Sequence, residues 1–311
     1  MLNVPRVPDY QHLQEDDLVK PTSARVFFDP ADTETGIWAA RDLITQGCGV
    51  LDLGSGSGAA AAAMARAGAR VHGVDHGPET VAWASEHYTS QEGRSKVTFA
   101  CGDFSVLSAE ELLATAPNLL PRPLIITSNP PYVPFSAQVG EPLSSIGGGT
   151  DGLNLVPAII EHCRSLRSGL ALTIGSYSTP RKAVRMLEAA GLRICAITLC
   201  SLPLSQFTLR NIRQVLALED EGEAILWRTG PHEQPAYFVI GLACRWSGET
   251  GTRDDVRHRA HSAVRGLMRL LKAAAASRTP RLEALDGARL GGWPGSLRVL
   301  DLPDCVDRHQ W

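Results

Sequence analysis

Residues 49–58 read Gly49-Val50-Leu51-Asp52-Leu53-Gly54-Ser55-Gly56-Ser57-Gly58. The first five are apolar except for Asp52, which is typical of a strand buried on both faces of a parallel sheet. The glycines that follow allow the backbone to approach a ligand closely. An Ala-rich run at about 58–67 predicts a helix, whose first N–H groups have no partner within the helix. The stretch therefore predicts a strand, a ligand-binding loop and a helix in succession.

Three further units of the same kind follow along the chain. We expect strands at 69–74, 96–100 and 123–127, and later strands at 169–175, 193–199 and 236–243. Alternating strands and helices predict an α/β fold with a doubly wound, Rossmann-like sheet of seven strands. In such a sheet, ligands bind beyond the carboxyl ends of the strands.

Candidate ligand-binding residues lie at or just beyond the ends of the first three predicted strands, where a nucleoside would bind. Asp75 can accept hydrogen bonds from both hydroxyls of a ribose. Asp103 can accept from the amino group of an adenine, and Phe104 can pack on its ring. Asp52 can hold an α-amino group. These positions predict a nucleoside carrying an amino-acid moiety.

A dinucleotide is the alternative ligand, because Gly54-x-Gly56-x-x-Ala59 with an acid about twenty residues later also fits a dinucleotide loop. Asp52 would face a pyrophosphate unfavourably, however. The sequence Asn129-Pro130-Pro131-Tyr132, further along the chain, also has no role in hydride transfer. The residues therefore favour S-adenosyl-L-methionine over a nicotinamide cofactor.

The fourth strand leads into Ser128-Asn129-Pro130-Pro131-Tyr132. The Asn129 carbonyl can accept a hydrogen bond. Pro130 and Pro131 fix φ and lack N–H groups, so the backbone here offers rigid carbonyl acceptors, and Tyr132 adds a flat ring. Together they predict a slot for a planar nitrogen. The alternative is an ordinary X-Pro-Pro turn at the end of a strand.

These motifs, in this order, resemble the class I S-adenosylmethionine-dependent methyltransferases of the HemK (release-factor glutamine methyltransferase) type. The resemblance covers residues of about 32–160: Asp32-Thr33-Glu34, Asp52 to Gly58, Asp75, Gly102-Asp103, Asn129-Pro130-Pro131-Tyr132 and Gly148-Gly149-Thr150-Asp151-Gly152-Leu153. It implies that Asn129 and the Pro130 carbonyl orient a planar nitrogen against the ring of Tyr132.

Three overlapping sets of site residues are therefore predicted: catalytic, substrate-contacting and cofactor-binding. The catalytic set is Asn129, Pro130 and Tyr132, with Asn129, Tyr132 and Tyr177 contacting the substrate. No metal ligand is predicted. The residues expected to bind S-adenosyl-L-methionine are Thr33, Asp52, Gly54, Ser55, Gly56, Gly58, Asp75, His76, Gly102, Asp103, Phe104 and Asn129.

The chain departs from the family in the parts that bear on the substrate. Family members carry a helical domain before the sheet that grips a protein substrate. Here fewer than fifty residues precede Val50, Pro30-Ala31 stands where the family has Arg-Pro, and Pro157 replaces a basic residue. A small molecule of biosynthesis is therefore the expected acceptor.

Three alternatives stay open. S-Adenosylmethionine could itself be the substrate, cyclising to azetidine-2-carboxylate with release of methylthioadenosine, and Asn129, Tyr132 or Tyr177 would then hold its amino group and sulfonium. The chain could methylate a protein glutamine, as the family does. It could also be a non-catalytic subunit that binds S-adenosylmethionine, which the intact Asn129 to Tyr132 stretch disfavours.

Composition bounds the partners. With a net charge of −3, the 311-residue chain shows no electrostatic footprint for nucleic acid. Its seven cysteines lack zinc spacing and indicate reduced thiols. The run from Met1 to Lys20 is polar and acidic, and no apolar stretch is long enough for a membrane span. A cytoplasmic protein is expected, with a homodimer possible.

We predict three parts: a lead-in segment (1–46), the methyltransferase domain (47–245) and a C-terminal extension (246–311). The lead-in helix is expected at about 33–46, capped by Asp32 or Thr33, and Asp151 is expected to cap a helix at about 151–166. The domain contains an insertion at about 201–235, either a cap over the site, an oligomer contact or a surface excursion. A helix is expected there, with Leu209, Ile212, Val215 and Leu216 on one apolar face.

The C-terminal extension begins with a long predicted helix at 254–276. It is basic on one side, and we expect its apolar stripe to pack against the protein: Val264, Leu267, Met268, Leu270 and Leu271. His258 and His261 lie one turn apart on it and are interpreted as surface residues. No element is predicted after Arg278.

Overall fold

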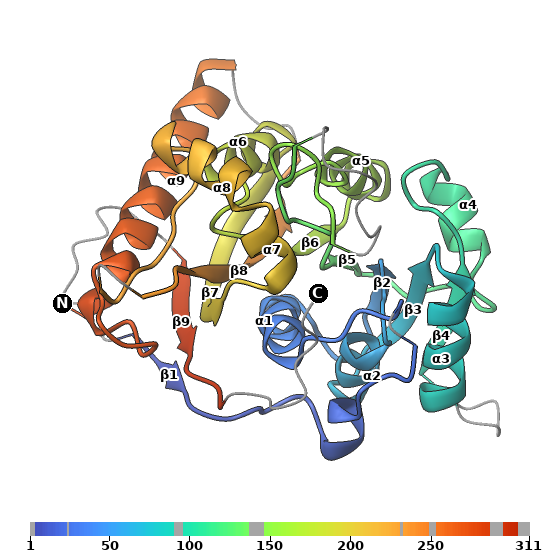
Figure 1. Ribbon diagram of the computed structural model, residues 1–311. Helices are drawn as coiled ribbons and strands as arrows, with labels where there is room; N and C mark the ends of the chain where they lie inside the picture. The colour runs from blue at the N-terminus through green and yellow to red at the C-terminus, as the bar shows by residue number, and fades with distance from the viewer. Residues whose placement is uncertain are drawn as a thin grey trace.

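The described part of the chain forms a nine-stranded sheet with helices on both faces (Figure 1). The computed structural model describes residues 4–23, 25–89, 96–136, 146–230, 233–248, 253–286 and 295–303. The strands are β1 (Arg6–Val7), β2 (Gly49–Leu53), β3 (Arg70–Asp75), β4 (Val97–Cys101), β5 (Leu124–Ser128), β6 (Gly169–Gly175), β7 (Leu192–Pro203), β8 (Ala236–Trp246) and β9 (Ser296–Leu300).

The strand order is β1-β9-β7-β8-β6-β5-β2-β3-β4. All neighbours pair in parallel except β8, which runs antiparallel between β6 and β7. β2 pairs with β3 on one side and β5 on the other, so the winding reverses there. This reversal is the topological switch point at which open α/β sheets bind ligands. The predicted doubly wound fold is confirmed.

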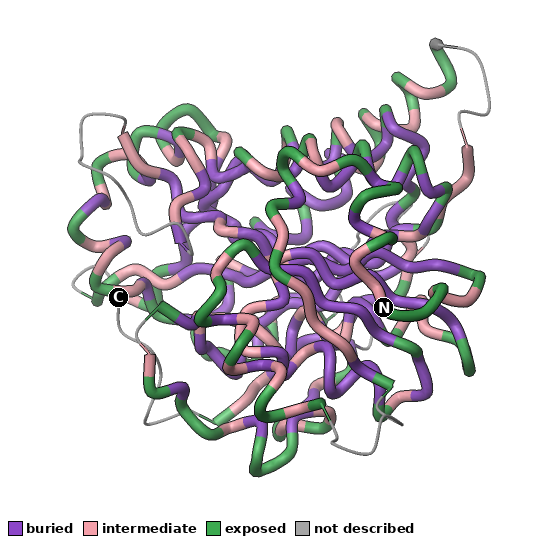
Figure 2. Tube along the Cα trace, turned by 90° about the vertical axis from the view of Figure 1, so that its right-hand side faces the viewer, coloured by how far each residue is buried: buried purple, intermediate pink, exposed green. Residues whose placement is uncertain are grey.

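The helices form two layers. Those of one face are α1 (Pro30–Arg41), α2 (Ala59–Arg66) and α3 (Pro78–Tyr88); those of the other are α4 (Ala109–Ala114), α5 (Val156–Leu166), α6 (Pro180–Ala189) and α9 (Arg253–Ala275). Two short helices, α7 (Gln206–Arg210) and α8 (Ile212–Asp220), lie between β7 and β8, and the 3-10 turns are η1 (Glu15–Leu18) and η2 (Glu283–Leu285). Because both faces are covered, every residue of β2 and β5 is buried, as the buried central strands in Figure 2 show.

Two helix starts differ from prediction. α1 begins at Pro30 rather than Thr33, and its cap is Asp29, whose carboxylate accepts from the Asp32 N–H at 3.2 Å. Proline is favoured at the first helical position because the N–H it lacks would have no partner there. α5 begins at Val156. Asp151 instead accepts from the Leu153 N–H at 3.0 Å within the preceding turn.

The predicted insertion helix is two helices, separated at Asn211. Val215 and Leu218 are buried, whereas Leu216 is 37% exposed. The prediction that Leu216 belongs to the apolar face was wrong, because the break at Asn211 shifts the inward face toward Leu218. β7 also continues to Pro203, four residues beyond the predicted strand end.

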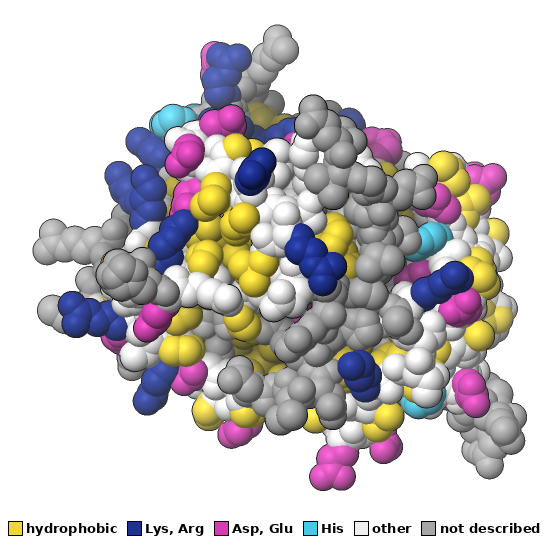
Figure 3. All heavy atoms as spheres, in the orientation of Figure 1, with side chains coloured by type: hydrophobic (Ala, Val, Ile, Leu, Met, Phe, Trp, Pro, Cys, Tyr) yellow, Lys and Arg dark blue, Asp and Glu magenta, His cyan; other side chains and the backbone are white. Residues whose placement is uncertain are grey.

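The two ends of the described chain meet at one edge of the sheet. β9 pairs with β7, and β1 pairs with β9, which adds two strands to the seven that were predicted. The predicted apolar stripe of α9 is buried, including Val264, Leu267 and Leu271. Lys and Arg side chains gather outside it (Figure 3). The rest of the predicted tail, 287–294 and 304–311, lies outside the described residues.

Within the described ranges, no helix is both long and apolar enough to cross a lipid bilayer.

Candidate active site

A cavity of about 690 Å³ opens at the carboxyl ends of β2, β3, β5 and β6. It is lined by most of the predicted site residues: Thr33, Asp52, Gly54, Ser55, Gly56, Asp75, His76, Phe104, Asn129, Pro130, Tyr132 and Tyr177. Its size is within the range of pockets that hold cofactors and small ligands. The structure thus brings together predicted residues that are spread over nearly half of the chain, from Thr33 to Tyr177.

The glycine loop forms one wall of the cavity. Gly54 and Gly56 have φ angles of +73° and +54°, a region that side chains rarely adopt. A Cβ on Gly56 would meet no atom of the described residues within 4 Å, so open space lies beside this backbone. The Asp75 carboxylate fixes the loop: it accepts from the Gly56 N–H at 3.0 Å and from the Gly77 N–H at 2.9 Å. Each Asp75 oxygen keeps acceptor capacity for a ligand hydroxyl.

Three residues predicted to bind the cofactor do not line the cavity. Gly58 serves packing, because a Cβ there would lie 2.8 Å from atoms of Ala84 and Phe99. Gly102 donates its N–H to the Asp75 carbonyl at 2.9 Å. Asp103 is exposed, and hydrogen bonds from the Ser105 hydroxyl and N–H lower the pKa of its carboxyl. A direct contact of Asp103 with an adenine stays a prediction.

Asp52 is a buried carboxylate on the cavity wall. Thr127 donates its hydroxyl to Asp52 Oδ1 at 2.6 Å. Burial raises the pKa of the Asp52 carboxyl to about 6; the Thr127 hydrogen bond opposes this rise and the charge of Asp75 adds to it. A buried carboxylate with a raised pKa is suited to receive a cation, because a cation stabilises its charged form.

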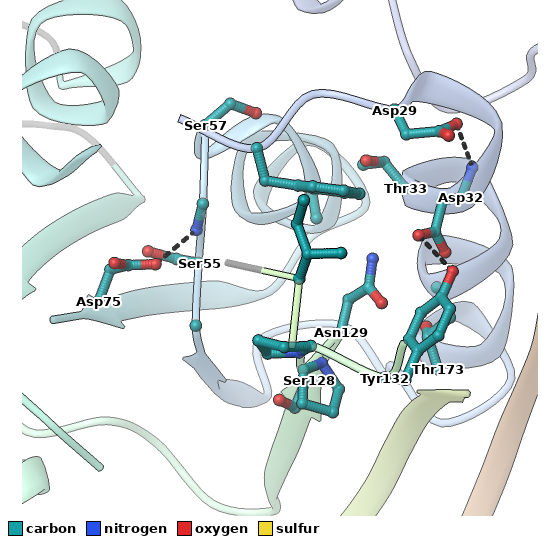
Figure 4. A pocket seen from close by; sticks show the side chains of 18 of the residues that line it. Asp29, Asp32, Thr33, Ser55, Ser57, Asp75, Ser128, Asn129, Tyr132 and Thr173 are labelled. Carbon is teal, nitrogen blue, oxygen red and sulfur yellow. Dashed lines mark hydrogen bonds between the residues drawn. The ribbon is translucent and has the colours of Figure 1, made fainter. Parts of the chain in front are cut away.

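Asn129 lies between the glycine loop and the start of α1 (Figure 4). Its Oδ1 atom is buried and has no hydrogen-bond partner among the described residues. Ser128, just before it, donates its hydroxyl to the Leu53 carbonyl at 2.7 Å, which fixes the end of β5 to β2. Buried polar atoms are nearly always hydrogen-bonded, so an acceptor of this kind in a cavity wall indicates that a ligand supplies the donor.

The Gly-rich segment 147–152 and Ser178 pack against the backbone of residues 132–133 and hold it in place. Gly148 donates its N–H to the Val133 carbonyl at 2.9 Å, and Ser178 donates its hydroxyl to the Tyr132 carbonyl at 2.8 Å. A Cβ on Gly152 would lie 2.4 Å from Ser178 Cβ and 2.6 Å from the Tyr132 oxygen. Glycine is required there because the two backbones pass too closely for a side chain.

Tyr132 is itself held by neighbours. Its hydroxyl donates to Asp32 Oδ2 at 2.7 Å and lies 3.3 Å from the Tyr237 hydroxyl. The ring centroids of Tyr177 and Tyr237 are 4.4 Å apart, and that of Tyr132 lies 5.9 Å from Tyr177. Burial, and then the charge of Asp32 or a neighbouring tyrosine, raises the pKa of the Tyr132 and Tyr177 hydroxyls well above the ordinary value. Both are therefore neutral donors at neutral pH.

The sequence analysis missed several residues of this cavity. Asp32 and Tyr237 complete the tyrosine cluster, and Thr127 holds Asp52. Asp32 belongs to the Asp-Thr-Glu motif that had been quoted, so its position was visible although its partner was not. No sequence signal distinguished Tyr237 from other apolar residues of the last strand. The described residues contain no cluster of three or more metal-ligating side chains.

The family model described as a methyltransferase domain matches residues 50–114. No curated protein matches the chain. One similar structure is a candidate RNA methyltransferase from Pyrococcus horikoshii, with 14% identity over 77% of this chain and 92% of that one and a TM-score of 0.45. A second is a precorrin-6y C5,15-methyltransferase from Geobacter metallireducens, with 13% identity over 75% of this chain and 98% of that one and a TM-score of 0.41. A third is the E. cuniculi Mtq2–Trm112 complex, with 18% identity over 70% of this chain and 98% of that one and a TM-score of 0.39. At these TM-scores the likeness says nothing about the substrate of this chain.

The matched segment runs from β2 to α4 and includes the glycine loop and Asp75. The chain thus carries a methyltransferase domain, whose cofactor is S-adenosyl-L-methionine, and is an enzyme of the transferase class. The residues present fit this cofactor: open space lies beside Gly56, and the buried Asp52 carboxylate can receive an ammonium. The buried Ser55 hydroxyl has no hydrogen-bond partner within the described part of the chain, so it is available to a ligand.

Proposed function

We propose that this chain transfers the methyl group of S-adenosyl-L-methionine to a planar nitrogen of a small molecule. The observation that carries the proposal is the buried Asn129 Oδ1, an acceptor in the wall of the cavity that no described residue pairs with. Leaving such an atom unpaired costs about 1–3 kcal/mol. A substrate N–H that donates to it recovers this energy and is oriented by it.

The cofactor would be held at the glycine loop. Asp52 would hold the α-ammonium group, Asp75 the ribose hydroxyls, and Phe104 would pack against the adenine. All three residues line the cavity on the side of β2 and β3. Bound there, the cofactor supplies an electrophilic methyl group. The remaining steps depend on residues of this chain, which must orient the acceptor and exclude water.

A planar amide or aromatic amine nitrogen is a weak nucleophile because its lone pair is delocalised. The N–H groups of this nitrogen would donate hydrogen bonds to Asn129 Oδ1 and to the Pro130 carbonyl. These hydrogen bonds polarise the N–H bonds and increase the electron density on the nitrogen. Pro130 and Pro131 keep the backbone rigid, so these acceptors need little reorganisation. Tyr132 lies beside them with its hydroxyl bonded to Asp32, which fixes the orientation of its ring.

The walls of the cavity favour a small acceptor. The start of the insertion lines it with Pro203, Leu204, Ser205 and Gln206, and Gln234 lines it just before β8. The chain itself therefore covers this side of the site. A protein glutamine, which the HemK family methylates, would have to enter this cavity on an extended loop. It is the alternative acceptor to a small molecule.

The proposal is tested with Asn129→Ala. We expect turnover to be lost, while the affinity for S-adenosylmethionine stays within about tenfold of wild type, or roughly 1.4 kcal/mol. Asn154→Ala is the matched control, because it removes the same side chain from an exposed position. Products are identified by mass spectrometry after incubation with cell extract, a panel of amides and aromatic amines, and a glutamine-containing peptide. If calorimetry instead shows that Asn129→Ala abolishes cofactor binding, Asn129 belongs to the cofactor site.

The tyrosine cluster favours one second candidate. Aromatic faces and the Asp32 carboxylate line the same cavity and suit a sulfonium. S-Adenosylmethionine would then be the substrate: its amino nitrogen, after losing a proton, attacks the side-chain carbon attached to sulfur, the C–S bond breaks, and its electron pair leaves with methylthioadenosine. Incubation without any acceptor separates the candidates, because only the cyclisation would form azetidine-2-carboxylate, with methylthioadenosine released faster than in a protein-free control.

A further inference from the structure

The cavity continues past Asn129 to a group of four side chains from four distant segments. They are Asp32 from the first turn of α1, Tyr132 after β5, Tyr177 after β6, and Tyr237 from β8. We name these residues the Asp32 cluster. Figure 4 shows Asn129 between the glycine loop on one side and Asp32 with Tyr132 on the other. The cluster is thus on the side of Asn129 opposite to the proposed cofactor site.

The Asp32 cluster combines a carboxylate with aromatic faces. Asp32 is 2% exposed, and its Oδ2 accepts from the Tyr132 hydroxyl. Tyr177 and Tyr237 pack with their rings inclined by 43°. Tyr132 and Tyr177 are neutral, so these two tyrosines add no negative charge. A carboxylate next to ring faces is the arrangement that binds ammonium groups.

The charges around the cavity also favour a cation. Acidic side chains dominate its lining: Asp29, Asp32, Asp52, Asp75 and Glu79. The basic groups among the described lining residues are Arg25 and His76. Arg25 pairs with Glu79 at 3.1 Å, and His76 lies 3.5 Å from Asp75. Both basic groups are thus next to other acids, near the glycine-loop side of the cavity.

We propose that the Asp32 cluster is the subsite for a protonated amine on the methyl acceptor. The inference rests on the proposed function and narrows its substrate class to small molecules that carry an ammonium group as well as a planar nitrogen. The ammonium donates to the Asp32 carboxylate and contacts the tyrosine faces, while Asn129 receives the nitrogen to be methylated. Asn129 and Asp32 line the same cavity and lie on one side of the proposed cofactor site (Figure 4), so a single small molecule can contact both.

The test measures equilibrium binding, so it does not depend on turnover. The protein is saturated with S-adenosylhomocysteine, and butylammonium chloride and 1-butanol are titrated separately by ligand-observed NMR. We expect wild type to bind butylammonium at least about tenfold more tightly than the alcohol. Equal affinities in wild type overturn the proposal, whatever the outcome of the methylation assay.

Asp32→Asn keeps the shape of the side chain and removes its charge. We expect it to lose the preference for butylammonium. Glu79→Gln is the matched control, because it removes a charge from the same cavity outside the cluster, and it should retain the preference. If both variants lose the preference equally, the cavity attracts cations through its overall charge and the subsite is refuted.

A second measurement distinguishes whether the Asp32 cluster binds the ammonium group of the acceptor or the sulfonium group of the cofactor. We expect Asp32→Asn to leave the affinities for S-adenosylmethionine and S-adenosylhomocysteine unchanged within about twofold. If it weakens S-adenosylmethionine about tenfold and S-adenosylhomocysteine not at all, the cluster holds the sulfonium, and the assignment to the acceptor is wrong.

Discussion

Tyr132 donates its hydroxyl to Asp32 at 2.7 Å, across one hundred positions of sequence, and this hydrogen bond joins the stretch after β5 to the first turn of α1. Both side chains are buried and both line the cavity. The ring that was predicted to stack on a substrate nitrogen is thus held by α1, the helix before β2.

The bond between Tyr132 and Asp32 contributes to stability. Tyr132→Phe should lower the free energy of unfolding by about 1.5–3 kcal/mol, because a buried carboxylate loses a donor. Urea denaturation measures this, and a double-mutant cycle with Asp32→Asn separates the pairwise part. Strictly additive effects of the two substitutions would show that the hydroxyl and the carboxylate do not interact.

Cofactor binding should depend on the ionisation of Asp52. Its pKa is about 6 in the ligand-free protein, and an ammonium partner favours the charged form. Affinity for S-adenosylmethionine should therefore fall about tenfold between pH 7 and pH 5, as the carboxylate takes up a proton. Calorimetry at several pH values measures the fall, and Asp52→Asn should flatten it. A wild-type affinity that does not change with pH would exclude Asp52 as the ammonium partner.

The Asp52 carboxyl also affects the stability of the ligand-free protein, and this effect has the opposite dependence on pH: stability falls as the pH rises, whereas cofactor affinity increases. Its folded pKa lies above the ordinary 3.8, so the folded chain binds more protons than the unfolded chain at intermediate pH. The contribution of Asp52 to stability should therefore fall as the pH rises from about 4 to about 6. Comparing wild type with Asp52→Asn in urea melts isolates this contribution, and parallel curves for the two proteins would contradict it.

Gly152 and Gly222 form a matched pair of glycines. Both have positive φ angles, +78° and +74°. A Cβ on Gly152 would lie 2.4 Å from Ser178 Cβ, whereas one on Gly222 would meet no described atom within 4 Å. Gly222→Ala should cost only the backbone strain, about 1–2 kcal/mol. Gly152→Ala should add overpacking and cost about 2–5 kcal/mol in total. Similar unfolding free energies for the two variants would show that the close approach at Gly152 is relieved without cost.

Glu34 anchors the N-terminal segment to α1. Its carboxylate is fully buried and accepts from the N–H groups of Gln11, His12 and Leu13 at 3.1–3.2 Å, and from the His12 ring at 2.8 Å. Glu34→Gln replaces one acceptor oxygen by a donor, so hydrogen exchange at residues 11–13 should speed up by about tenfold or more. Exchange that stays as slow as in wild type would show that other contacts hold the segment. Glu79→Gln, at an exposed position, is the control.

Several elements were predictable from the sequence because local patterns encode them. The run from Gly49 to Leu53, its glycine loop and its Ala-rich helix are adjacent in the chain, and the apolar runs at β5 and β6 show burial directly. Positions that fail the prediction depend on distant contacts or on a single cap. Asp29 rather than Asp32 caps α1, and the break at Asn211 turns Leu218 inward in place of Leu216.

The sequence by itself determined the doubly wound sheet, the glycine loop and the acids at the strand ends, because a parallel sheet brings its carboxyl ends to one edge. Only the tertiary structure decided that Asp32, Tyr132, Tyr177 and Tyr237 meet, since β8 enters antiparallel between β6 and β7 and α1 packs across them. It also decided that β1 and β9 extend the sheet. Short-range periodicity records which side of an element is buried, but not which distant segment buries it.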